Sequence, residues 1–296
     1  MRVSVQILAR VHAAAVAILM AAVGSHRSGA QDLLPSEAAA TLVREVVYNE
    51  LHDHEHHGYW RYWIERRVQG GVSVEQQVET SEGPIKRLAM GNGRPLSATA
   101  EQQERARLDR LLTSPLEQAR ERKQYGQDEA RIGRIVALLP DAFVYEYDGQ
   151  EDGCYRLRFH PNPDYPSHST EARIFHAMSG TLWVDPRYKR LAGLEGHMDE
   201  NVDFGLGILG RLYKGGWFRL KRVRVSVTDW KTESLEVHLN IRALLLANFT
   251  RETSEVRGGF MPVSPGLTLK EGVALLEQPT LQSLPANLVV AMALNR

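Results

Sequence analysis

Apolar residues recur every three or four positions in the first part of the chain. Between residues 32 and 57 the repeat falls at Leu42, Val43, Val46, Val47 and Leu51. That spacing places these side chains along one face of a helix. The Pro-Ser-Glu sequence at residues 35–37 is a favourable helix start. The pattern therefore predicts an amphipathic helix over residues 32–57.

From Gly58 the repeat changes to every second residue. Trp60, Tyr62 and Ile64 alternate with a second set of side chains, which indicates a strand with one face rich in bulky apolar groups. Glycine-containing turns follow at residues 70–71, 82–84 and 91–93. Short strands joined by such turns predict an antiparallel meander.

Two helical patterns interrupt the strands over residues 97–139. The first begins at a capping sequence, and its leucines lie among charged residues at positions 108, 111 and 112. The second carries Ile132, Ile135, Val136 and Leu139, and we expect it to stop at Pro140 because proline disrupts a helix interior. Both helices are amphipathic and need a surface to lie on.

Strand patterns dominate the chain from Phe143 onward. One set of alternating apolar residues is Tyr155, Leu157 and Phe159, and a later set is Leu235, Val237, Leu239 and Ile241. Further strands are predicted at about 172–184, 187–197, 201–212, 216–229 and 234–248. Several long strands in sequence predict one large antiparallel sheet, and with the helices this indicates an α+β fold.

The last part of the chain contains a helical pattern and an apolar tail. Residues 268–276 predict a short amphipathic helix. The tail over residues 280–296 is apolar but contains Pro285. We expect a packed or frayed end there, because this segment cannot cross a membrane as one uninterrupted helix.

The amino terminus has the three-part layout of an export signal. Arg2 and Arg10 provide a positive start, residues 13–23 are apolar, and small residues occupy 28–30. We expect cleavage after Ala30, which predicts a periplasmic mature protein, and no cysteine follows to attach a lipid. The apolar segment is short for a membrane span. The alternative is an uncleaved anchor or an incorrectly assigned start residue.

Charge and cysteine content narrow the function classes. Removing residues 1–30 deletes three arginines and no acidic residue, so the formal net charge changes from 0 to −3. A chain of this kind has no basic footprint for nucleic acid. Cys154 is the only cysteine, which excludes an internal disulfide and a cysteine-rich zinc site. The fold must therefore be stabilised by its core.

Residues 205–210, GLGILG, match the G-x-G-x-x-G pattern of dinucleotide-binding folds, and Asp229 stands at about the right distance for a ribose contact. That motif requires a helix directly after it, whereas residues 211–217 predict a turn and then a strand. We interpret the glycines as allowing a strand to bend or another group to approach its backbone. The sequence contains no other catalytic motif, so we predict a protein that is not an enzyme and uses no cofactor.

A histidine cluster occupies residues 51–57, LHDHEHH. Imidazole and carboxylate ligands suit zinc, copper or nickel, and four histidines are available at His52, His54, His56 and His57. A functional metal site normally gathers ligands from separate elements and orients them by further contacts. We therefore interpret the cluster as the solvated carboxyl end of the first helix, where the helix dipole favours positive charge. A metal site is the alternative.

Two short motifs and the order of elements resemble a known family. Residues 180–186 read GTLWVDP and are followed by Arg190 and Leu191, and a strand ending in VET at 78–80 precedes a Gly-Pro turn. With the exported helix–strand–helix–strand order, these features resemble the periplasmic lipoprotein-carrier superfamily, which includes the outer-membrane lipoprotein-sorting carrier and receptor. The resemblance covers most of the mature chain.

The resemblance implies a particular architecture. Residues 31–296 would form a single domain with a helical insertion at about 97–139. A strongly curved antiparallel sheet would make an unclosed half-barrel, with amphipathic helices lidding its concave face. Carriers of this family latch the lid with an arginine, and the sequence alone does not assign that role to any one arginine of this chain.

The resemblance also implies a function. The hollow would hold a lipid or lipoprotein acyl chain, in a non-enzymatic envelope protein that carries or senses it, with envelope membrane proteins as further partners and no transmembrane span in the mature chain. The predicted lining residues are Trp60, Tyr62, Ile64, Tyr155, Leu157, Phe159, Trp183, Leu235, Val237, Leu239 and Ile241. The alternatives are a metal-dependent envelope protein or enzyme using residues 52–57, and an envelope sensor or protein-interaction module.

Overall fold

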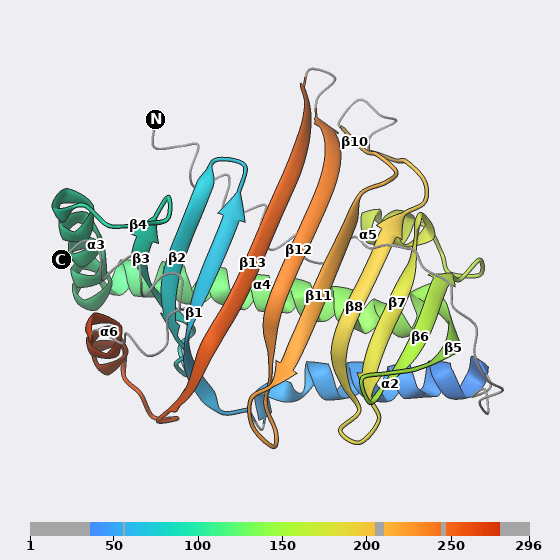
Figure 1. The fold of residues 1–296 in the computed structure, drawn as a ribbon, viewed down its shortest axis with the longest axis horizontal. Helices are drawn as coiled ribbons and strands as arrows, with labels where there is room; N and C mark the ends of the chain where they lie inside the picture. Colours follow the sequence, from blue (N-terminus) through green and yellow to red (C-terminus); the bar gives the residue numbers. More distant parts are fainter. Residues whose placement is uncertain (1–35, 56, 205–209, 244–246, 279–296) are drawn as a thin grey trace. The chain divides into compact units, whose positions relative to one another are not determined.

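The computed structural model describes residues 36–55, 57–204, 210–243 and 247–278. Its strands form one antiparallel sheet in the order β4-β3-β2-β1-β13-β12-β11-β8-β7-β6-β5, and β10 pairs with β12 and β9 (Figure 1). The path begins at β4 and ends at β5 without closing. The predicted α+β class with a large, unclosed antiparallel sheet is confirmed.

The chain divides into two compact units. Two of the boundaries fall inside α4, between Glu129 and Ala130, and inside β13, between Glu252 and Thr253. The others lie after residue 56 and on either side of residues 225–229, which belong to the second unit. The first unit contains the helices α2 (Ser36–Leu51), η1 (Asp53–Glu55) and α5 (Thr170–His176) and the second half of α4 (Pro115–Ala142). Its strands are β5 (Phe143–Glu151), β6 (Cys154–Pro161), β7 (Met178–Asp185), β8 (Arg190–Met198), β9 (Val202–Phe204), β10 (Gly210–Leu212), β11 (Trp217–Arg224) and β12 (Trp230–Ala243).

The second unit is built around the predicted meander. It contains β1 (Tyr59–Val68), β2 (Gly71–Val78), β3 (Ile85–Gly91), β4 (Arg94–Pro95), α3 (Ala98–Thr113), α6 (Leu269–Glu277), the first half of α4 and most of β13 (Ala247–Val263). β1 pairs antiparallel with β2 and with β13. On one face of this meander, Val78 and Ile85 pack with Leu108 of α3 and with Val273 and Leu276 of α6.

Several predicted boundaries were wrong for identifiable reasons. The first helix ends at Leu51 rather than at residue 57 and gives way to a 3-10 turn. Helix α4 continues through Pro140 to Ala142. The strand expected from residue 172 begins only at Met178, because Ser169 caps a short helix by accepting a hydrogen bond from the backbone N–H of Ala172 at 3.0 Å.

Two strand predictions also changed. The strand expected over 201–212 is described as the short strands β9 and β10, and the residues between them lie outside the described part. β13, the longest strand, was not predicted. β13 pairs with β1 through the polar residues Thr253, Glu255 and Arg257. Because these positions are not apolar, the sequence shows no two-residue apolar repeat that would predict a strand there.

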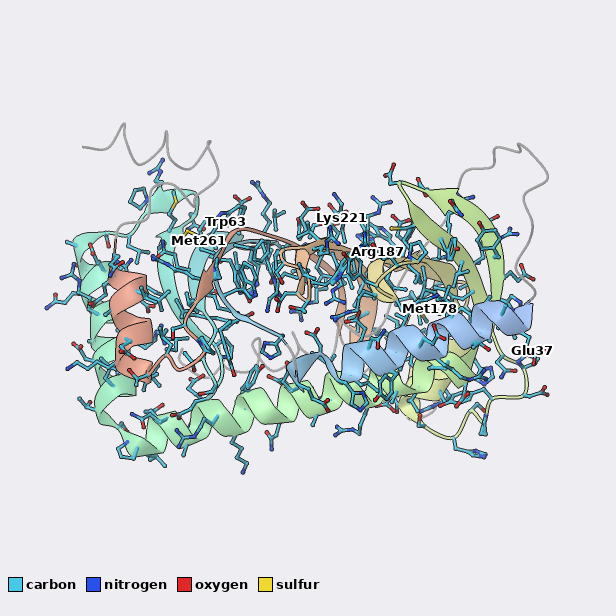
Figure 2. The ribbon with its side chains drawn as sticks, turned by 90° about the horizontal axis from the view of Figure 1, so that it is seen from below. Glu37, Trp63, Met178, Arg187, Lys221 and Met261 are labelled. Carbon is cyan, nitrogen blue, oxygen red and sulfur yellow. The ribbon has the colours of Figure 1, made fainter. Side chains whose placement is uncertain are left out.

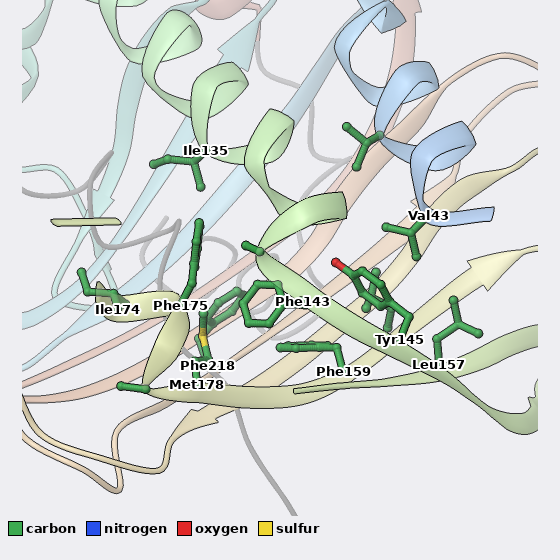
Figure 3. Close-up of a cluster of buried hydrophobic side chains, with 14 of the residues drawn as sticks. Val43, Ile135, Phe143, Tyr145, Leu157, Phe159, Ile174, Phe175, Met178 and Phe218 are labelled. Atoms are coloured by element: carbon green, nitrogen blue, oxygen red, sulfur yellow. The ribbon is translucent and has the colours of Figure 1, made fainter. Parts of the chain in front are cut away.

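An aromatic group fills the inner face of the first unit, the face covered by α2 and the second half of α4. The Phe143 ring lies 4.7 Å from that of Phe159 and 5.3 Å from that of Phe175, both between ring centroids (Figure 3). Aromatic pairs at such separations add to the stabilisation from burial alone. Phe218 completes the group from β11 (Figure 3).

Gly180 provides the space for these rings. It pairs with Gly196 across β7 and β8. A Cβ atom at Gly180 would overlap the backbone oxygen of Glu195 and would lie 2.6 Å from the Gly196 Cα and 2.8 Å from the Phe159 ring. The glycine of the GTLWVDP motif therefore permits close packing at the centre of the inner face.

The variant Gly180→Ala should lower the free energy of unfolding by about 1–3 kcal/mol, because backbone and ring must both shift. The matched control is Gly126→Ala in α4, where an added Cβ meets no atom within 4 Å. That control should gain roughly 0.5–1 kcal/mol from helix propensity. Denaturant unfolding of both variants checks the pair, and a stable Gly180→Ala protein would contradict the packing argument.

Candidate functional site

The inner face of the first unit carries a cluster of buried apolar side chains in the described residues. It is formed by strands β5 to β12 and by helices α2, α4 and α5. Helix α2 contributes a stripe of buried side chains, Ala39, Leu42, Val43, Val46 and Val47. Figure 3 shows Val43 of α2 and Ile135 of α4 directed toward the aromatic group on the sheet. The helices therefore occupy the surface at which a bound acyl chain was expected.

Most predicted lining residues of the later strands meet in this cluster. Leu157, Phe159, Leu235, Val237 and Leu239 are buried in it. Tyr155 and Ile241 pack against its border and are partly buried. The alternation read from the sequence therefore identified the correct face of β6 and β12.

The other predicted lining residues lie elsewhere. Trp60, Tyr62 and Ile64 are buried in the second unit, in a separate cluster with Val225 and Phe260. Trp183 lies on the opposite face of β7 from the buried residues Leu182 and Val184. Its indole N–H donates to the Glu151 carboxylate at 2.8 Å. In the GTLWVDP motif the aliphatic residues face the core and the tryptophan faces outward.

A buried ionic network fixes the carboxyl end of α2 to the sheet. Arg190 on β8 donates to Glu50 at 3.0 Å and also to the Asp53 carboxylate. Arg222 on β11 donates to the other oxygen of Glu50 and to the backbone oxygen of Trp230 at 2.8 Å. The backbone N–H of Leu191 donates to Glu50 as well, at 3.1 Å. We call these contacts of Glu50, Asp53, Arg190 and Arg222 the helix anchor.

Three of the four charged side chains of the helix anchor are almost removed from water, and the fourth, Asp53, is 26% exposed. The side chains of Arg190, Arg222 and Glu50 are 10%, 12% and 15% exposed. Burial acts to raise the pKa of the Glu50 carboxyl, but the charges and hydrogen bonds of Arg222 and Arg190 outweigh it, so this pKa lies below its ordinary value. A carboxylate ionised in this way holds both arginines. Losing it would remove the carboxylate that pairs with Arg222 and would leave Arg190 paired with Asp53 alone.

Further polar contacts reinforce the same end of α2. The Asn49 amide donates to the backbone oxygen of Lys189 at 3.0 Å. The Lys189 amine lies 3.8 Å from the Glu45 carboxylate. Lys189 has a φ of 51°, in the left-handed region, within the turn between β7 and β8. The turn and the helix end are therefore held together by both backbone and side-chain groups.

The carboxyl end of α2 is held by ionic contacts, whereas its amino-terminal half borders an open groove. The groove has a volume of about 560 Å³ and is lined by Glu37, Ala38, Thr41, Leu42, Glu45, Tyr155 and Lys189. Figure 2 labels Glu37 at the start of α2. Leu42 is 5% exposed and belongs to the apolar cluster, so the groove reaches the edge of the core.

The sequence patterns did not predict the helix anchor. The sequence contains one indication of such a contact. Glu50 lies in the last turn of α2, and that turn, which the structure describes in full, has no basic residue. A carboxylate at this end opposes the helix dipole, so its presence indicates a partner from another element. Nothing in the sequence pattern identifies Arg190 and Arg222 as that partner, because they lie 140 and 172 positions away.

The second unit buries a polar network on the face opposite α6. The Tyr62 hydroxyl donates to Glu79 at 3.2 Å, and Gln77 donates to that hydroxyl. Burial raises the pKa of the Tyr62 phenol. Beside them, Arg66 and Arg257 donate to the buried Glu255 at 2.8 Å and 2.6 Å. Burial opposes ionisation of Glu255, but the two guanidinium groups lower its pKa to about 2.

The described part of the histidine cluster shows local contacts. The His52 ring stacks on Tyr48 with 4.0 Å between centroids, and its Nδ1 lies 2.8 Å from the Tyr48 backbone oxygen. His57 Nδ1 lies 2.9 Å from the Gly58 backbone oxygen. Among the described residues no three His, Cys, Asp or Glu side chains are placed to hold a metal ion. The side chain of His54 and all of His56 lie outside the description, so the metal hypothesis remains a prediction.

Other predictions also fall on undescribed residues. The signal peptide at 1–30, the tail at 280–296 and most of the GLGILG motif are outside the described ranges. Gly210 is described, and it opens the strand β10 rather than a helix. In the parts of the chain that the structure describes, no helix has the length and apolar character needed to cross a membrane.

The variant Glu50→Gln should lower the free energy of unfolding by about 2–4 kcal/mol, because Arg190 and Arg222 lose their shared counter-charge. The matched control, Glu45→Gln on the same helix, removes a carboxylate that is 53% exposed and should change stability by less than about 0.5 kcal/mol. Denaturant unfolding at neutral pH measures both. Equal effects of the two variants would show that the helix anchor does not stabilise the unit.

The difference in free energy of unfolding between the natural chain and Glu50→Gln should depend on pH. The folded-state pKa of Glu50 lies below its ordinary value of 4.5, so the stabilisation is fully present above that pH. It should decrease as the pH falls through the lower folded-state value, since the carboxyl becomes protonated in both states. Unfolding measured from neutral to acidic pH tests this, and a constant difference between the two proteins would contradict it.

Comparison with known proteins assigns no family. No protein-family model matches the chain, and no curated protein matches it. Among solved structures, a DUF1329 family protein from Desulfovibrio piger ATCC 29098 aligns with 82% of this chain and 99% of its own, at 10% sequence identity and a TM-score of 0.28. At that TM-score the similarity is that of a distant structural neighbour and assigns no activity.

Proposed function

We propose that this protein is exported to the cell envelope and binds the acyl chain of a lipid or lipoprotein, as a non-enzymatic carrier or sensor. Export rests on the signal-peptide pattern of residues 1–30. The acyl chain would lie on the inner face of the first unit, on the apolar surface that α2 covers in the described state. Helix α2 would then act as a lid.

The unequal attachment of α2 carries this proposal. At its carboxyl end, the helix anchor and Asn49 fix α2 to β8, to β11 and to the turn before β8. At its amino end, the polar contacts give way to the groove beside Leu42 and Tyr155. A helix held in this way can lift at its amino end while its carboxyl end stays in place. Conformational change of this kind needs a ligand that favours the open state.

An acyl chain has enough apolar surface to favour that state. Lifting α2 would expose four buried side chains, Leu42, Val43, Val46 and Val47. Their exposure to water costs roughly 2 kcal/mol each, or about 8 kcal/mol together. Each methylene of a buried chain contributes roughly 0.8 kcal/mol, so a chain of about ten methylenes offsets the exposure. Longer chains exceed it. The balance therefore favours lipid-length chains over short ones.

Binding of straight-chain fatty acids should consequently show a length threshold. Acids below about ten carbons should bind weakly, and acids of about fourteen to eighteen carbons should bind tightly and compete with a fluorescent fatty acid. The measurement is displacement of that probe from the purified mature chain. No displacement by any acid would contradict the proposed function.

A pair of neighbouring variants locates the binding face. Leu239→Asn alters a side chain that is 4% exposed on the inner face of β12, whereas His238→Asn alters the opposite face. The first should weaken binding of a long-chain acid at least tenfold, and the second should leave it unchanged. If Leu239→Asn does not fold, a photoreactive fatty acid should label peptides of β6 or β12 through inner-face residues. Labelling confined to the outer face would overturn the location.

A further inference from the structure

We infer that the groove beside the first half of α2 binds the headgroup of an ethanolamine phospholipid, with Glu37 contacting the ammonium group and Lys189 contacting the phosphate. The inference rests on the proposed function, since the acyl chains of the same lipid would enter the core past Leu42. It adds a headgroup preference, which burial of the acyl chains does not require.

The groove combines an apolar end with a charged end. Leu42 and Ala38 form the apolar part and continue into the core, whereas Glu37, Glu45 and Lys189 supply charge. Its volume of about 560 Å³ falls within the range of roughly 300–1,000 Å³ typical of ligand pockets. A molecule with a charged head and an apolar chain matches this division.

The positions of the charges favour a zwitterion. Lys189 is already 3.8 Å from Glu45, and that pair is 40% and 53% exposed. None of the ion pairs among the described residues involves Glu37, so its carboxylate remains available for a cation. The groove thus has one excess negative charge beside an accessible amine. A ligand that has only a phosphate leaves the excess carboxylate unpaired.

The turn that carries Lys189 is fixed in place. The backbone N–H of Lys189 donates to Asp185 at 2.9 Å, and its backbone oxygen accepts from Asn49 at 3.0 Å. The amine therefore projects from a defined point beside α2. Glu37 lies in the first turn of α2, where the helix dipole favours a negative charge.

Headgroup chemistry then distinguishes three common phospholipids. An ethanolamine ammonium is a compact cation with three N–H donors, which a carboxylate can accept. A choline group has the same charge but no N–H donor. A glycerol headgroup has no cation. Exposed ion pairs contribute about 0.2–1 kcal/mol, so each contact should change affinity by about 1.4-fold to fivefold and should weaken in high salt.

The experiment measures binding of phosphatidylethanolamine, phosphatidylcholine and phosphatidylglycerol with identical acyl chains to the purified mature protein. Phosphatidylethanolamine should bind up to about fivefold more tightly than phosphatidylglycerol, whose headgroup has no cation. It should also bind more tightly than phosphatidylcholine, which keeps the charge but has no N–H group to donate to Glu37. Glu37→Gln should remove this preference, and Lys189→Gln should weaken all three, since each has a phosphate. Glu200→Gln, at an exposed site outside the groove lining, should change nothing.

The outcomes separate the headgroup inference from the proposed function. Equal binding of the three lipids would overturn the headgroup inference and leave acyl-chain binding intact. A preference that persists in Glu37→Gln would overturn the assignment to this groove. Failure of all three lipids and of long-chain fatty acids to bind would overturn both proposals. Circular dichroism of each variant confirms that it is folded before its binding is compared.

Discussion

The Glu50 carboxylate lies at the carboxyl end of α2, where the helix dipole opposes it, and two arginines from the sheet hold it there. Because the three side chains are nearly buried, each depends on the others for its charge to be compensated. This interaction sets the position of α2 on the sheet. The burial of the valines and Leu42 along α2 follows from that position.

The same interaction explains how one surface could serve two purposes. Apolar burial has no direction, so the inner face of β6 and β12 is satisfied by the side chains of α2 or by a chain of methylenes of similar area. Ionic contacts depend strongly on geometry, and in the described residues those of α2 lie in its carboxyl-terminal half, at Glu45 and Glu50. A lid that combines the two can exchange its apolar contacts while one end remains attached. That combination, rather than the amount of apolar surface, motivates the functional proposal.

Glycine has a distinct role in this arrangement. Gly180 and Gly196 face each other on neighbouring strands, and the ring of Phe159, which contacts that of Phe143, packs where a side chain at Gly180 would otherwise stand. The inner face is therefore densely packed at its centre, while the groove lies at its border beside Tyr155. In the proposed function, a ligand that enters at the border would displace α2 and leave the aromatic centre in place.

Local patterns were sufficient for some of these features. The two-residue alternation of Leu157 and Phe159, and of Leu235, Val237 and Leu239, identified the buried face of two strands. The three- and four-residue repeat identified the stripe of α2 that packs on it. These properties depend only on neighbouring residues along the chain, so the sequence determines them directly.

Other features were decided by tertiary structure. Trp183 resembled a lining residue, but strand pairing directs Leu182 and Val184 to the core and places Trp183 outside. The polar positions of β13 gave no strand pattern, although β1 pairs with it along its length. The partnership of Glu50 with Arg190 and Arg222 joins residues far apart in the chain. The sequence by itself determined which faces are apolar, whereas only the fold decided which charges meet, because ionic partners leave no periodic pattern.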